Sequence, residues 1–181
     1  MGQDWRPNRA ISTPLMLKLL TLVESRIRTS QELEDRCRWV MAGSYFCFCY
    51  VVSLRSSEGV MVDVMGFREY GESTLEHVII PLMRQVKGED HTRQHLIHCA
   101  NQTDSGIDVR KWVSRLRTIH SIMGKQNGPA FTNLSSGIQS TTSEMNDLFI
   151  ELLTEIHEDH RDLFAVDIQS PGDLSDKYHV Y

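Results

Sequence analysis

The hydrophobic positions near the start of the chain repeat with the period of a helix. They mark one face of a helix that begins near Pro14, at Leu15, Leu19, Leu22, Val23 and Ile27. Ser12 or Thr13 can cap the first turn of this helix, where proline is also favoured. We therefore predict a connecting helix ahead of the main body of the chain.

A second helix is predicted to begin after Ser30. Glu32 and Glu34 place negative charge in its first turn, which complements the helix dipole. Apolar residues then become frequent over residues 39–52, so this helix is expected to lie in the core. A polar stretch, residues 53–59 (SLRSSEG), follows the apolar run directly and predicts the end of the helix.

Two β-branched stretches in the middle of the chain predict a hairpin. Residues 77–82 are typical of a strand, and Pro81 favours an edge position. Residues 85–90 are typical of a turn, and residues 94–100 of a returning strand. Lys87 is expected near the tip of this hairpin.

Helical patterns return in the second half of the chain. One face of a helix is marked by Val109, Trp112, Val113 and Leu116. Residues 124–140 are rich in Gly, Ser, Thr and Asn and predict a loop, and a further helix is expected from Ser143 to about Glu158. A short segment follows Pro171. These elements predict an α+β fold, mostly helical with a small antiparallel β-hairpin.

Composition and charge narrow the class of protein. The chain has 181 residues, of which 40% are hydrophobic and 24% charged, which excludes disordered and collagen-like chains. The formal net charge of −5 argues against a nonspecific polycation but permits a local basic site. The spacing of the four cysteines fits neither a disulfide framework nor a zinc ribbon. With no apolar stretch that approaches a membrane span, we expect an intracellular protein, cytoplasmic or nuclear, with reduced thiols.

The candidate catalytic residues lie in two short polar segments. Arg55 follows the buried helix and is followed three residues later by Glu58, and Lys87 on the hairpin tip is followed by Arg93. Two cations brought together from positions 32 apart would form a phosphate site. The alternative is structural: an ion pair between Arg55 and Glu58, and a solvated lysine on a turn. Spacing alone favours that alternative.

Both segments resemble motifs of the tyrosine recombinases, the phage integrase family. Residues 53–59 resemble the first catalytic box, and Lys87-Gly88 with Arg93 resembles the β-hairpin lysine element. Further similarity to a divergent branch, carried by eukaryotic mobile elements and algal or large-virus genomes, lies in residues 80–82, 103–107 and 128–131. The resemblance implies an N-terminal tail and connecting helix over residues 1–30 and a partial catalytic domain over residues 31–181.

The resemblance also implies a chemistry. In that family a tyrosine hydroxyl attacks a DNA phosphodiester and gives a 3′-phosphotyrosyl intermediate and a free 5′-hydroxyl. Arg55 would bind the nonbridging oxygens of the phosphate, and Lys87 would protonate the leaving 5′-oxygen. Glu58 would orient Arg55 or support the fold. The implied partners are double-stranded DNA and, in the full-length protein, further copies of the chain, with no membrane, cofactor or metal.

The rest of the family's motif set does not follow Lys87. The HxxR box is not found, because His179 would need an arginine at the position after Tyr181, and neither Tyr178 nor Tyr181 is assigned as the nucleophile. We therefore expect a recombinase fragment that cannot cleave DNA alone. The second hypothesis is a noncatalytic helical DNA-binding or protein-interaction module.

Two other groups of residues are candidate binding sites. A basic helix face carries Arg110, Lys111, Arg115 and Arg117, which either contact DNA phosphates or form a solvated surface. His91, His95, His98 and Cys99 are spaced like metal ligands on a helix, but on a strand His95 and His98 point to opposite faces. We therefore expect ordinary strand histidines and no metal site.

Overall fold

Helices and one antiparallel hairpin make up the fold. The computed structural model describes residues 10–64, 77–85, 92–134 and 136–178. In chain order the elements are α1 (Thr13–Thr29), α2 (Leu33–Val51), α3 (Ser56–Gly59), β1 (His77–Gln85), β2 (Thr92–Ala100), α5 (Val109–Ile122), α6 (Thr142–Asp159), η1 (Arg161–Leu163) and α7 (Gly172–Lys177). The predicted α+β class, mostly helical with a small antiparallel sheet, is confirmed.

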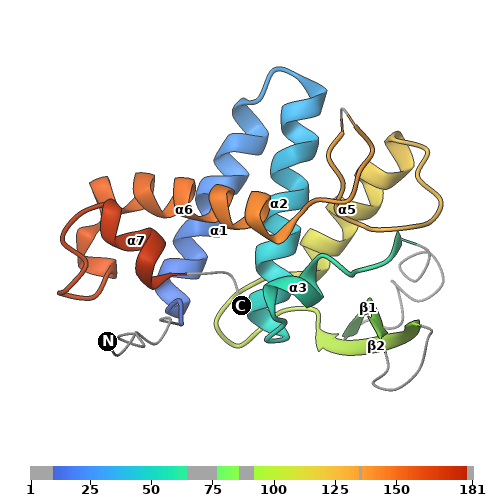
Figure 1. Ribbon diagram of the computed structural model, residues 1–181, viewed down its shortest axis with the longest axis horizontal. Helices are drawn as coiled ribbons and strands as arrows, with labels where there is room; N and C mark the ends of the chain where they lie inside the picture. The colour runs from blue at the N-terminus through green and yellow to red at the C-terminus, as the bar shows by residue number, and fades with distance from the viewer. Residues whose placement is uncertain (1–9, 65–76, 86–91, 135, 179–181) are drawn as a thin grey trace, which may run out of the picture.

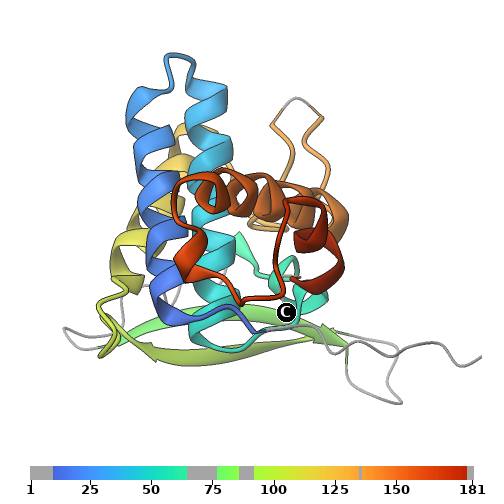
Figure 2. The same ribbon diagram turned by 90° about the vertical axis from the view of Figure 1, so that its left-hand side faces the viewer.

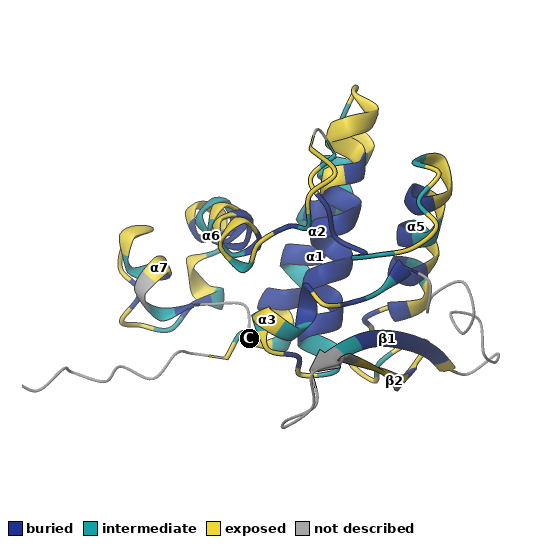
Figure 3. Cartoon of the chain, turned by 45° about the vertical axis from the view of Figure 1, so that its right-hand side comes forward, coloured by how far each residue is buried: buried dark blue, intermediate teal, exposed yellow. Residues whose placement is uncertain are grey.

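Helix α2 forms the centre of the molecule. Helix α1 runs beside it as an antiparallel neighbour, α5 packs on another side, and the hairpin lies at one end (Figure 1). Helix α6 crosses in front of the α1–α2 pair (Figure 2). The side chains of α2 are buried without interruption from Trp39 to Cys49 (Figure 3). The apolar run that the sequence shows over 39–52 is therefore the main core helix.

Close approach between α2 and α5 depends on a glycine. A Cβ atom on Gly43 would lie 2.3 Å from Cζ3 of Trp112, closer than side-chain atoms tolerate. Ser44 is the next residue of α2, and its hydroxyl donates to the carbonyl oxygens of Val40 at 2.8 Å and Trp112 at 3.2 Å. A buried hydroxyl is thus satisfied in this apolar interface.

Side-chain caps fix where the helices begin. The hydroxyl of Ser12 accepts from the N–H of Leu15 at the start of α1, as one of the two predicted caps. At α6, Thr141 and Glu144 form a reciprocal capping box, in which each side chain accepts from the other's backbone N–H. This box is why α6 begins at Thr142, one residue before the predicted Ser143.

The hairpin is longer than predicted and has a third neighbour. Its register runs from His77 opposite Ala100 to Gln85 opposite Thr92. On the other side of β1, Val62 forms an isolated antiparallel bridge with Leu82. The carbonyl oxygen of Pro81 accepts from the N–H of Asp63 at 3.1 Å. Pro81 is tolerated at this position because residues 62–63 use only its carbonyl oxygen, as an acceptor, and need no N–H from it.

Within the described ranges, no helix has both the length and the apolar character needed to cross a membrane.

Candidate functional site

The polar stretch after α2 presents Arg55 to solvent. Ser53 adopts a positive φ of 52°, which reverses the chain at the end of the helix. Leu54 then inserts into the core with 2% of its surface exposed, whereas Arg55 is exposed. The guanidinium of Arg55 has no hydrogen-bond or ion-pair partner in the part of the chain that the structure describes. It is therefore available to an anionic ligand.

Glu58 acts on the backbone of Arg55. Its carboxylate oxygen Oε2 accepts from the backbone N–H of Arg55 at 3.0 Å and so caps α3. The ion pair between the two side chains that spacing alone favours is not formed. Of the two roles that the family resemblance implies for Glu58, this geometry matches support of the local fold.

Residues 60–64 connect the Arg55 segment to two other parts of the chain. On one side, the N–H of Met83 in β1 donates to the carbonyl of Met61 at 2.9 Å. On the other side, the N–H of Ala130 donates to the carbonyl of Val62 at 2.7 Å. The side-chain amide of Gln139 adds a hydrogen bond to the carbonyl of Val60 at 2.7 Å. The loop predicted over 124–140 therefore holds the segment that follows Arg55.

The predicted partner of Arg55, Lys87, lies outside the described residues. The strands that carry it are described as far as the pair Gln85 and Thr92. Figure 1 shows α3 between the end of α2 and this hairpin. Arg93 follows Thr92 at the beginning of β2 and is exposed. The hairpin is thus hydrogen-bonded to residues 61–63, which closely follow Arg55, although Arg55 and Lys87 are 32 residues apart in sequence.

The predicted basic face of α5 is divided into two parts. Arg110 is exposed in the first turn. Lys111 pairs with Glu24 of α1, Nζ to Oε1 at 2.5 Å, and Arg115 lies 3.5 Å from the same oxygen. The guanidinium of Arg115 also stacks 5.0 Å from the ring centre of Trp112. Lys111 and Arg115 therefore hold α5 against α1, and their charge is partly neutralised there.

The candidate metal ligands on β2 differ in how far they are buried. His95 and His98 are exposed on β2, Cys99 is buried, and His91 lies outside the described residues. No group of three or more potential ligands in the described ranges has the arrangement of a metal site.

The four cysteines are unpaired and buried. Burial raises the pKa of Cys99 to about 11 and that of Cys49 to about 12, and it also raises the pKa of Cys47. These thiols stay protonated near neutral pH and are poor nucleophiles.

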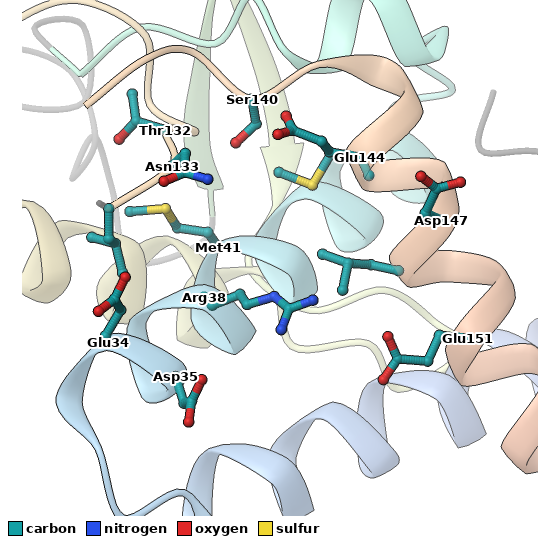
Figure 4. Close-up of a pocket in the computed structure, with 13 residues that line it drawn as sticks. Glu34, Asp35, Arg38, Met41, Thr132, Asn133, Ser140, Glu144, Asp147 and Glu151 are labelled. Carbon is teal, nitrogen blue, oxygen red and sulfur yellow. The ribbon is translucent and has the colours of Figure 1, made fainter. Parts of the chain in front are cut away.

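An acidic groove, which the sequence did not lead us to predict, lies between residues 34–41 of α2 and residues 144–151 of α6. Its volume is about 480 Å³, and Arg38 reaches from α2 into it (Figure 4). The carboxylates that line it are Glu34, Asp35, Glu144, Asp147 and Glu151. The spacing of the last three, which places them on one face of α6, is the signal that could have found it. Five carboxylates around one guanidinium repel phosphate, so this groove is not the phosphate site.

Comparison of the chain with family models, curated proteins and solved structures finds no match.

Proposed function

We propose that this chain is part of a DNA breaking-and-rejoining domain of the tyrosine recombinase type, in which Arg55 binds a DNA phosphate. The observation that carries the proposal is the setting of Arg55. Its guanidinium is exposed and unpaired among the described residues, while its backbone is held by Glu58 at 3.0 Å. A fixed backbone with an available cation is what a preorganised phosphate site requires.

The hairpin supports the second part of the proposal. The segment after Arg55 is hydrogen-bonded to β1 through Met61 and Asp63, and β1 leads towards Lys87. In the proposed reaction a tyrosine hydroxyl gives up its proton to solvent and its oxygen bonds to phosphorus, while the bond from phosphorus to the 5′-oxygen breaks. Arg55 neutralises the nonbridging oxygens, and Lys87 donates its proton to the departing 5′-oxygen.

The charge distribution supports one orientation on DNA. Arg55, Arg93 and Arg110 are exposed on elements away from the acidic groove. DNA binding through these residues leaves the five carboxylates of the groove away from the phosphates. The proposed partners are double-stranded DNA and further copies of this chain on the DNA.

The proposal is tested by DNA binding of the full chain and of Arg55→Ala. A fluorescein-labelled duplex of mixed sequence is titrated, and anisotropy gives Kd over a range of salt concentrations. Loss of one phosphate contact is expected to weaken binding about tenfold and to lower the slope of log K against log salt by about 0.9. Arg161→Ala, a change of an exposed arginine in η1, is the matched control and is expected to leave both quantities unchanged.

Three outcomes bear on the two hypotheses. Equal binding by Arg55→Ala and wild type contradicts the proposal. Binding that depends on Arg55, with no detergent-resistant covalent complex on a nicked duplex, supports the phosphate site and fits both a recombinase fragment that cannot cleave DNA alone and the noncatalytic DNA-binding module. A covalent complex that is lost in Arg55→Ala identifies the enzyme.

A further inference from the structure

Tyr45 makes the contact that fixes the residue next to Arg55. Its side chain is fully buried at the centre of α2. Its hydroxyl donates to the carbonyl oxygen of Ser56 at 3.0 Å. Ser56 follows Arg55 directly and opens α3, so this bond joins the core helix to the segment that presents the guanidinium.

The ring of Tyr45 also receives the end of α3. A Cβ atom on Gly59 would lie 2.7 Å from Cε2 of Tyr45 and 2.5 Å from Sγ of Cys49. Only glycine allows α3 to approach α2 this closely. On its other side the ring packs edge-on against Phe131, with 5.5 Å between ring centres. The ring is thus fixed from both sides, and its hydroxyl has one defined position.

The hydroxyl of Tyr45 keeps its proton and therefore remains a hydrogen-bond donor. Burial raises the pKa of Tyr45 above its ordinary range, so the O–H is retained at every physiological pH. A carbonyl that loses such a donor in a partly buried site must find another partner, and the turn that contains it shifts to do so.

We propose that Tyr45 is a positioning residue for Arg55: its hydroxyl holds the Ser56 carbonyl and its ring seats Gly59, so the guanidinium is presented at one place on the surface. This role rests on the proposed function of Arg55 as a phosphate ligand. Two hydrogen bonds then fix the backbone around Arg55. The carboxylate of Glu58 accepts from the N–H of Arg55, and the hydroxyl of Tyr45 donates to the carbonyl of Ser56.

The test compares two tyrosine-to-phenylalanine changes in the same helix. Tyr45→Phe removes the hydroxyl at Ser56 and keeps the ring. Tyr50→Phe is the matched control, because its hydroxyl bonds to Thr13 of α1 at 2.6 Å, away from α3. With the same fluorescein-labelled duplex, Tyr45→Phe is expected to raise Kd about two- to tenfold, the range of one hydrogen bond. Tyr50→Phe is expected to leave Kd unchanged.

A double variant separates positioning from general loss of structure. If Tyr45 acts through Arg55, Tyr45→Phe has no further effect on Kd in the Arg55→Ala background. Gly59→Ala is the second variant, and it is expected to weaken binding in the wild-type background alone. Thermal unfolding of each variant, followed by circular dichroism, verifies that the folded protein is being titrated.

Three results would overturn part of this picture, each in a distinct way. Wild-type Kd in Tyr45→Phe, while Arg55→Ala binds weakly, overturns the role of Tyr45 alone. Equal weakening by Tyr45→Phe with and without Arg55 also overturns it, because the effect would then be general. An unchanged Kd in Arg55→Ala overturns the proposed function itself.

Discussion

The two ends of α2 have opposite electrostatic character. At its first turn, Glu34 and Asp35 face the carboxylates of α6 across the acidic groove (Figure 4). Beyond its last turn, the chain reverses at Ser53 and exposes Arg55, whose guanidinium has no partner among the described residues. One rigid helix of 19 residues, about 28 Å long at 1.5 Å per residue, separates these two surfaces.

This difference is compatible with the proposed phosphate site on an acidic chain. The net charge of −5 would by itself oppose DNA binding. Separation of charge along α2 removes most of that opposition, because charges more than about 10 Å apart are screened at moderate salt.

The largest expected effect comes from Phe131, because its ring packs in the core against two aromatic residues of α2. Its ring is fully buried against Tyr45 and Phe48. Phe131→Ala is expected to lower the free energy of unfolding by about 3–5 kcal/mol, measured by urea denaturation. Ile138→Ala in the same loop is the control, because that side chain is 68% exposed and its loss is expected to change the free energy of unfolding by less than about 0.5 kcal/mol. Comparable losses in the two variants would show that the loop does not anchor the core.

The second prediction concerns pH and His120, which links α5 to the same loop. Its Nε2 lies 2.8 Å from the carbonyl oxygen of Ala130, and its Nδ1 is buried with no partner in the described residues. Burial lowers the pKa of His120, to which Lys125 adds, although the Ala130 carbonyl opposes the shift. Because the unfolded chain takes up the proton first, the contribution of His120 to stability is complete above about pH 6.5 and is lost as pH falls below it.

Urea denaturation between pH 7.5 and 5 checks this prediction, with His120→Asn as the comparison variant. The wild type is expected to lose more stability across that range than the variant, which has no titrating ring at position 120. Parallel pH profiles for the two proteins would contradict the assignment.

A smaller effect on DNA affinity is expected from a change at Glu24, which neutralises two cations of α5. Glu24→Gln removes the carboxylate that pairs with Lys111 and Arg115. If these cations face DNA once released, the affinity for the labelled duplex rises a few-fold and the salt slope steepens by up to about 0.9 for each new phosphate contact. The cost in stability is about 0.2–1 kcal/mol, as for other partly exposed pairs. Unchanged binding would place these two cations away from the DNA.

The smallest effect on DNA affinity is expected from a substitution in the acidic groove. Asp147→Asn removes one exposed carboxylate at the other end of α2 from Arg55. Because of screening over that distance, Kd for the duplex is expected to change by less than about twofold at 0.1 M salt. A gain in affinity as large as that of Glu24→Gln would show that the groove faces DNA and would contradict the proposed orientation.

Much of the fold could be predicted because its signals are local. The period of the apolar residues located α1, α2, α5 and α6, and β-branched residues located the hairpin, whose strands extend a few residues further than expected. The starts of helices depended on single side chains, so α6 began at the capping box of Thr141 rather than at Ser143.

The candidate site was predicted less completely. Arg55 was found from its place after a buried run, and it is exposed. The role of Glu58 as a backbone cap, the pairing of Lys111 with Glu24 and the hold of Tyr45 on Ser56 were not foreseen. The acidic groove was not foreseen either, because its residues come from two helices and a loop.

The sequence by itself determined which segments are helix or strand and which of their faces are apolar, because periodicity, caps and turn residues act over a few neighbouring positions. Only the tertiary structure decided which charges are neutralised and which stay available. Glu24 and Lys111 are 87 residues apart, and their pairing depends on how α1 and α5 pack against α2. The distance between two charged groups on separate elements sets their interaction, and no local pattern encodes that distance.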